Sequence, residues 1–139
     1  MNRTLFVTAL LATLTATVHI FIGTPEIEAP LLQSSLSQEL SLLLYVCWHL
    51  VSAILIFSAL VFFVAARTEF HIKYQHTAKL ISLLWLSFGF IFIVIAAWYS
   101  GIPMLLKLPQ WVLFLPIGAL GLWASRDMSF NQTLESDMA

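Results

Sequence analysis

Two histidines, His19 and His49, lie inside apolar stretches that contain no Lys, Arg, Asp or Glu. Keeping an ionisable imidazole in hydrocarbon costs free energy, so such a side chain usually has a partner or a chemical task. Three carboxylates lie between them along the chain, and Glu26 and Glu28 are the two nearer to His19. Two imidazoles and one carboxylate suit Zn²⁺ or another divalent transition metal, with one position left open for water. The sequence therefore predicts a metal site of His19, His49 and Glu28, with Glu26 as the other choice of carboxylate.

Other roles fit the same two histidines. Each imidazole can hydrogen-bond to a hydroxyl group or a backbone carbonyl and so hold the first two helices in register. Histidines on two helices of a bundle also hold b-type haem, although no Lys or Arg lies near them to bind the propionates. An imidazole can also serve a proton relay or hydrogen-bond to a quinone or lipid headgroup. The alternatives are therefore a structural or accessory membrane subunit and a haem- or metal-dependent redox subunit, and the question of enzymatic activity stays open.

The elements that must position these residues are four long apolar runs. Of the 139 residues, 60% are hydrophobic and only 9% are charged, whereas soluble domains are about 25% charged. A bilayer core of about 30 Å takes roughly 20 helical residues. The predicted fold is an all-α membrane protein with four transmembrane helices in an antiparallel bundle over residues 1–126. The predicted spans are residues 4–22, 41–66, 79–99 and 107–124.

The segments outside the spans are also predictable. Gly23 and Pro25 are helix-ending signals, and Ser37 resembles the start of the second span. The sequence thus predicts a loop over residues 23–40, and a loop that folds back would bring Glu26 or Glu28 over the histidines. Residues 127–139 are predicted to form a polar tail.

Each histidine continues a row of small or polar residues at helical spacing. In the first span the row is Thr4, Thr8, Ala12, Thr15 and His19, and in the second it is Ser41, Tyr45, His49 and Ser52. Residues three or four apart share one face of a helix. Small and hydroxyl residues let membrane helices approach closely. Both faces are therefore expected to point into the bundle, where Trp48 and Trp85 serve as packing residues.

The basic residues indicate the orientation. Five of the six lie at the N-terminus, in the middle link or after the fourth run, namely Arg3, Arg67, Lys73, Lys79 and Arg126, and only Lys107 lies in another link. Cytoplasmic segments carry the excess of Lys and Arg. The prediction is a multi-pass protein of a bacterial inner membrane with both termini cytoplasmic, so that the histidines lie in the outer half of the bilayer.

Composition excludes several classes of protein. The net charge of −1 and the pI near 6.4 give no basic footprint for nucleic acid. A single cysteine, Cys47, allows no intramolecular disulfide and no CxxC motif. The chain is expected to be surrounded by the lipid bilayer. Whether it has a protein partner or forms a homo-oligomer is left open by the sequence.

One stretch of the first half resembles a known group. The run from His19 through Gly23, Pro25 and the Pro30-Leu31-Leu32 segment is followed by the Trp48-His49 pair. This pattern, within residues 15–55, is similar to a group of uncharacterised small four-helix bacterial integral membrane proteins. The group carries no activity to transfer, but the resemblance implies that His19, the outer loop and His49 act as one unit.

Overall fold

The computed structural model describes residues 1–67 and 71–137, with side chains described over 1–67 and 73–125. Every regular element in this part of the chain is a helix. Three segments are long and apolar enough to cross a membrane: Arg3–Leu32, Gln38–Ala66 and Lys73–Ser100. The apolar helix Trp111–Ser125 is shorter. These helices confirm the prediction of a helical chain that contains apolar helices long enough to cross a membrane.

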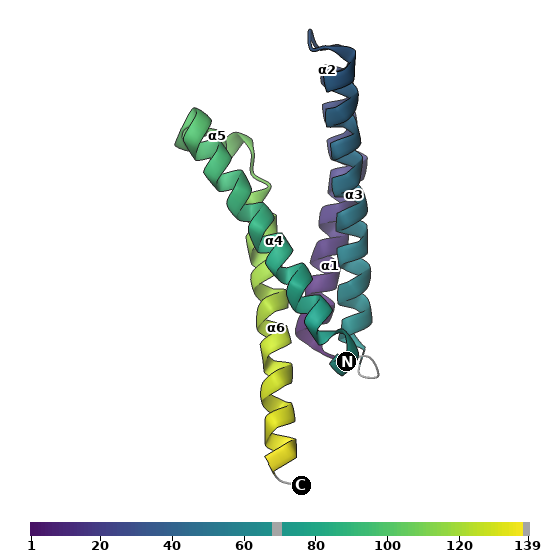
Figure 1. Cartoon of the computed structure of the whole chain (residues 1–139), viewed down its shortest axis with the longest axis vertical. Helices are drawn as coiled ribbons and strands as arrows, with labels where there is room; N and C mark the ends of the chain where they lie inside the picture. Colours follow the sequence, from purple (N-terminus) through teal and green to yellow (C-terminus); the bar gives the residue numbers. More distant parts are fainter. Residues whose placement is uncertain (68–70, 138–139) are drawn as a thin grey trace.

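The helices form two antiparallel hairpins that meet at one end and diverge at the other (Figure 1). The elements are α1 (Arg3–Val18), the π-helical turn η1 (His19–Gly23), α2 (Thr24–Leu32), α3 (Gln38–Ala66), α4 (His71–Ser100), α5 (Ile102–Lys107) and α6 (Trp111–Asp137). The first hairpin pairs the continuous α1–η1–α2 segment with α3, and the second pairs α4 with α6. Contacts of α1 with α6 and of α3 with α4 join the hairpins.

The predicted loop over residues 23–40 is wrong for most of its length, because α2 occupies Thr24–Leu32. Pro25 and Glu26 lie in the first turn of α2. The π-helical turn joins α1 to α2 without a break, so the true link is the short segment before Ser37. The predicted helix start there is confirmed, because the Ser37 hydroxyl accepts from the Leu40 N–H at 3.3 Å.

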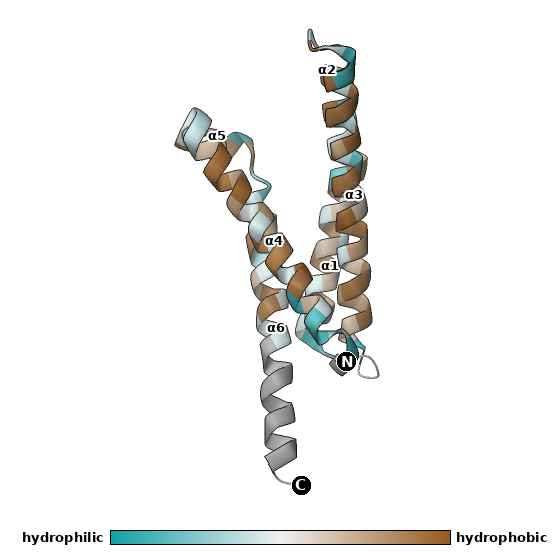
Figure 2. Cartoon of the chain, in the orientation of Figure 1, coloured by the Kyte–Doolittle hydropathy of each residue, from teal (hydrophilic) through white to brown (hydrophobic). Residues whose placement is uncertain are grey.

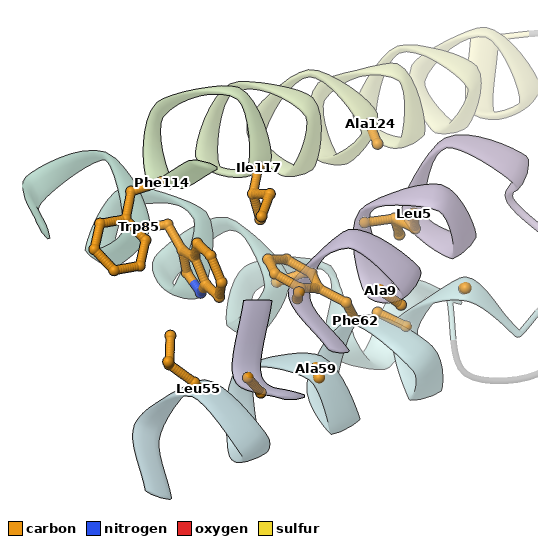
Figure 3. Close-up of a cluster of buried hydrophobic side chains, with 14 residues drawn as sticks. Leu5, Ala9, Leu55, Ala59, Phe62, Trp85, Phe114, Ile117 and Ala124 are labelled. Atoms are coloured by element: carbon orange, nitrogen blue, oxygen red, sulfur yellow. The ribbon is translucent and has the colours of Figure 1, made fainter. Parts of the chain in front are cut away.

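The core fills the junction where the two hairpins meet (Figure 3). All four long helices contribute to it, with Leu5 and Ala9 from α1, Leu55, Ala59 and Phe62 from α3, Trp85 from α4, and Phe114, Ile117 and Ala124 from α6. Trp85 is fully buried and packs edge-to-face on Phe114 with ring centroids 5.4 Å apart. The prediction of Trp85 as a packing residue is confirmed.

Glycines bring α4 and α6 close together. A Cβ at Gly89 would lie 2.6 Å from a Leu115 side-chain carbon, and a Cβ at Gly118 would lie 2.8 Å from the Ser82 carbonyl oxygen. A Cβ at Gly121 would collide with the Ser82 hydroxyl. A Cβ at any of the three positions would require the neighbouring helix to shift, most of all at Gly118, where backbone atoms lie closest.

The polar row of the first span faces the interior, as predicted. Thr8 and Thr15 are buried, and each hydroxyl donates to the carbonyl four residues earlier, at 2.9 Å. These bonds satisfy the hydroxyls within α1. In the second row Ser41 and Ser52 are buried, whereas His49 is exposed. The prediction that His49 points into the bundle is therefore wrong, because its side chain is exposed and packs against Tyr45.

The most hydrophilic residues of the described chain gather near the ends of the helices (Figure 2). The Asn2 N–H donates to the Ala66 carbonyl at 2.8 Å, which fixes the N-terminus to the end of α3. The link after α4 contains the short helix α5, entered through Gly101 at φ 75°. In the predicted tail over 127–139, α6 continues as a helix to Asp137.

Candidate functional site

Trp48 of the neighbouring helix α3 contacts both the face and the Nε2 atom of the His19 ring. The π-helical turn begins at His19, and the imidazole stacks on the Trp48 ring with centroids 3.9 Å apart and planes 19° from parallel. Nε2 of His19 lies 3.4 Å from the Trp48 carbonyl oxygen. A carbonyl only accepts, so this contact places the imidazole proton on Nε2. The same carbonyl also accepts from the Ser52 hydroxyl at 3.2 Å.

Trp48 is in turn held by the residues that follow His19. Its indole N–H donates to the Thr24 hydroxyl oxygen at 2.9 Å, and the Thr24 hydroxyl faces the His19 carbonyl oxygen at 3.5 Å. A Cβ at Gly23 would lie only 2.9 Å from Trp48 Cζ2, so the indole lies directly against the Gly23 backbone. We call His19, Gly23, Thr24 and Trp48 the His19 cluster. It joins η1 and α2 to the first third of α3.

His49 belongs to a second, neighbouring contact. Its ring packs edge-to-face on Tyr45, with centroids 4.6 Å apart and planes at 83°. The Glu28 carboxylate interacts with the Tyr45 hydroxyl from the α2 side. His49 and Glu28 therefore meet the same tyrosine, one against its ring and the other at its hydroxyl.

The predicted metal ligands are thus divided between these two contacts. His19 and His49 are within electrostatic range of each other, but Trp48 covers one face of the His19 ring. Within the described residues, no group of three or more His, Cys, Asp or Glu side chains could hold a metal ion. Glu26 and Glu28 also separate, because Glu26 lines a cavity with His19 while Glu28 faces Tyr45. The metal set of His19, His49 and Glu28 stays a prediction from the sequence.

The arrangement also bears on the haem alternative. An axial imidazole needs a nitrogen free to reach iron. Nε2 of His19 is directed at the Trp48 carbonyl oxygen, and Trp48 occupies the space beside the ring. With Nε2 engaged in this way, Nδ1 is the nitrogen of His19 that would be left to ligate iron.

A cleft opens between the two hairpins beside the His19 cluster. It has a volume of about 410 Å³, and its lining includes His19, Glu26, Trp48, Lys107, Gln110 and Phe114. A second cavity of about 200 Å³ has Phe88 and Phe92 in its wall. The two cavities share His19, Trp48, Gln110 and Phe114. The His19 cluster therefore lines one side of these two connected cavities, and the second hairpin lines the other side.

The contributions of Trp48, Lys107 and Gln110 to this site were not predicted from the sequence. A tryptophan next to a histidine inside an apolar run is a signal for Trp48, although it points equally to packing. Lys107 and Gln110 lie more than fifty residues from the histidines along the chain. Only the position of the second hairpin brings them to the cleft.

No protein-family model, curated protein or solved structure matches this chain. The class of protein follows from the fold and composition: a helical protein with membrane-length apolar helices and a polar site at the open end of two hairpins.

Proposed function

We propose that this chain is a four-span integral membrane protein of a bacterial inner membrane, with both termini cytoplasmic, that serves as a structural or accessory subunit. In this role His19 is a helix-locking residue. The observation that supports this function most directly is the contact of His19 with Trp48, which engages both the ring face and Nε2. An imidazole used in this way holds α1 and α3 in register.

The packing of α6 on α4 supports the fourth span. Gly118 and Gly121 of α6 lie against Ser82 of α4, and Ser82 is inside the candidate span Lys73–Ser100. A segment packed on a spanning helix at that depth lies in the membrane as well. The apolar part of α6 has 15 residues, or about 22 Å at 1.5 Å per residue. Local thinning of the bilayer accommodates such a shortfall.

Single-cysteine labelling tests this topology. In a Cys47→Ser background, a cysteine at exposed Thr77 should react with a charged maleimide only after cells are opened. A cysteine at exposed Glu28 should react in intact cells. Reaction of position 77 in intact cells would show the opposite orientation, and reaction of both positions from one side would contradict the spans.

A double-mutant cycle tests the locking role. His19→Ala and Trp48→Ala should each lower the free energy of unfolding in detergent, with a coupling energy of about 1–2 kcal/mol for a stacked, hydrogen-bonded pair. His49→Ala is the matched control. His49 is exposed and packs edge-to-face on Tyr45, so its substitution should cost less than His19→Ala and show no coupling to Trp48→Ala. Equal losses for the two histidines, or no coupling, would contradict the locking role.

A divalent-metal site is the second candidate, favoured by the shared contact of Glu28 and His49 with Tyr45 and by the proximity of His19. Two imidazoles and a carboxylate are a ligand set that suits Zn²⁺. Metal analysis of the purified protein tests it. Stoichiometric zinc that is lost in both His19→Ala and His49→Ala would support the metal site, and zinc-free protein after purification with added zinc would contradict it.

A further inference from the structure

The cleft between the hairpins contains a polar atom that nothing in the described chain satisfies. The side-chain oxygen of Gln110 is buried and has no hydrogen-bond partner among the described residues. Gln110 lines both parts of the cleft. A buried acceptor without a donor is costly, so its partner is expected from outside the chain. The group that fills the cleft should therefore carry an N–H or O–H donor.

Two opposite charges border the same cleft. Glu26 of α2 and Lys107 at the end of α5 both line it and both are exposed. The rest of its wall is largely apolar, with Leu55, Leu113 and Phe114 among the lining residues. A cation beside Glu26, an anion beside Lys107 and an apolar body along the hydrophobic wall together describe a zwitterionic amphiphile.

We propose that the cleft binds one phospholipid with a primary ammonium headgroup, whose N–H groups donate to Glu26 and Gln110 and whose phosphate pairs with Lys107. An acyl chain lies along the apolar wall between the hairpins. This proposal rests on the membrane location in the proposed function, but it requires neither the locking role of His19 nor a metal.

The hydrogen-bonding pattern selects this headgroup over others. A choline headgroup has the same charges but no N–H, so it leaves the Gln110 oxygen unsatisfied. A quinone offers only carbonyl acceptors, which cannot pair with that oxygen. The indole of Trp48, which also lines the cleft, favours a cation near its face.

The shape of the molecule gives a lipid access from the side. The hairpins diverge toward the end that carries α2 and α5 (Figure 1), so the cleft opens between spans rather than through a narrow channel. Ile102 and Leu106 of α5 are 75% and 80% exposed. Such side chains place α5 at the apolar boundary of the membrane, where Lys107 is at the level of lipid phosphates.

Native mass spectrometry of the purified protein tests the proposal. The full chain is placed in nanodiscs with equal amounts of phosphatidylethanolamine, phosphatidylcholine and phosphatidylglycerol that have identical acyl chains. We expect each chain to retain one phosphatidylethanolamine. The preference for it over phosphatidylcholine should be about tenfold, which is the selectivity that one charge-assisted hydrogen bond provides. Glu26→Gln and Gln110→Leu should each remove most of this preference. Lys107→Gln should weaken retention of all three lipids without changing their ratio.

The matched control is Glu28→Gln, which removes the same charge two residues away on the side that faces Tyr45. It should retain phosphatidylethanolamine like the parent chain. Gln110→Glu keeps an acceptor and should strengthen the preference, so the proposal stays testable if Gln110→Leu does not fold. Equal retention of the ethanolamine and choline lipids, or equal effects of Glu26→Gln and Glu28→Gln, would overturn it. A spectrum in which the protein is a dimer without bound lipid would also overturn the proposal.

The outcomes separate this proposal from the proposed function. Loss of headgroup selectivity with correct cysteine labelling would refute only the lipid site. A labelling pattern that contradicts the spans would refute the membrane topology itself.

Discussion

Gly23→Ala is the most direct test of the His19 cluster, because it adds one methyl group at the point where the chain meets Trp48. Gly23 has a helical φ of −68°, so alanine meets no backbone obstacle there. The new Cβ would lie 2.9 Å from Trp48 Cζ2 and 3.2 Å from Trp48 Cη2. The indole cannot easily yield, because His19 stacks on it and Thr24 accepts from its N–H.

The expected magnitude combines two opposite effects. Carbon atoms pack at about 3.5–4.0 Å, so the ring has to move by about 0.6–1 Å. Overpacking of this kind costs about 1–3 kcal/mol. Replacing glycine with alanine inside a helix returns about 0.5–1 kcal/mol. Gly23→Ala should therefore lower the free energy of unfolding by about 0.5–2 kcal/mol.

Unfolding in mixed detergent micelles, followed by circular dichroism, measures this change. The same substitution in a Trp48→Ala background is the control, because it keeps the helical preference of alanine and removes the collision. There it should stabilise the protein by about 0.5–1 kcal/mol. A stabilising effect in both backgrounds would show that Trp48 does not lie against Gly23.

Three further substitutions probe other parts of the molecule. Gly121→Ala places a methyl group against Ser82 and the Phe62 ring and should lower the free energy of unfolding by about 2–3 kcal/mol, measured in the same detergent titration. Gly101→Ala meets only an ordinary contact of 3.7 Å, but at φ 75° and ψ 179° the backbone strain alone should cost about 1–3 kcal/mol, and a larger loss would indicate an unseen contact. Phe62→Ala empties a fully buried site in the core and should cost about 3–5 kcal/mol. Cys47 is exposed on α3 and should react in membranes with a lipid-soluble maleimide without loss of thermal stability.

Much of the fold could be predicted because the apolar runs are long and their helical period is clear. The three long helices and the helix start at Ser37 follow from hydropathy and capping rules. The segment 24–32 could not be predicted as a helix, because Gly23 and Pro25 normally end one. Its helical form depends on the π-helical turn at His19–Gly23, and the contact of Gly23 with Trp48 that accompanies it is a tertiary one.

The candidate site was predictable only in part. Helical spacing placed His19 correctly on the inner side of the first span, because the row from Thr8 onward keeps spacings of three and four residues. The same reasoning failed for His49. Trp48, one residue earlier on α3, faces the neighbouring helix and so interrupts the second row. Two neighbouring aromatic side chains cannot both face the partner helix, and the larger indole takes that place. The roles of Lys107 and Gln110 depend on the packing of the second hairpin, which a single sequence does not encode in any local pattern.

The position of the core gives the cleft a mechanical property. The buried cluster around Phe62 lies where the hairpins join, and the cleft lies toward their free ends. From Phe62 to Ser41, α3 measures about 31 Å, so a rotation of about 5° at the core displaces its far end by about 2.7 Å. The junction is thus placed like a hinge, because a small rotation there is magnified into a larger change in the width of the opening.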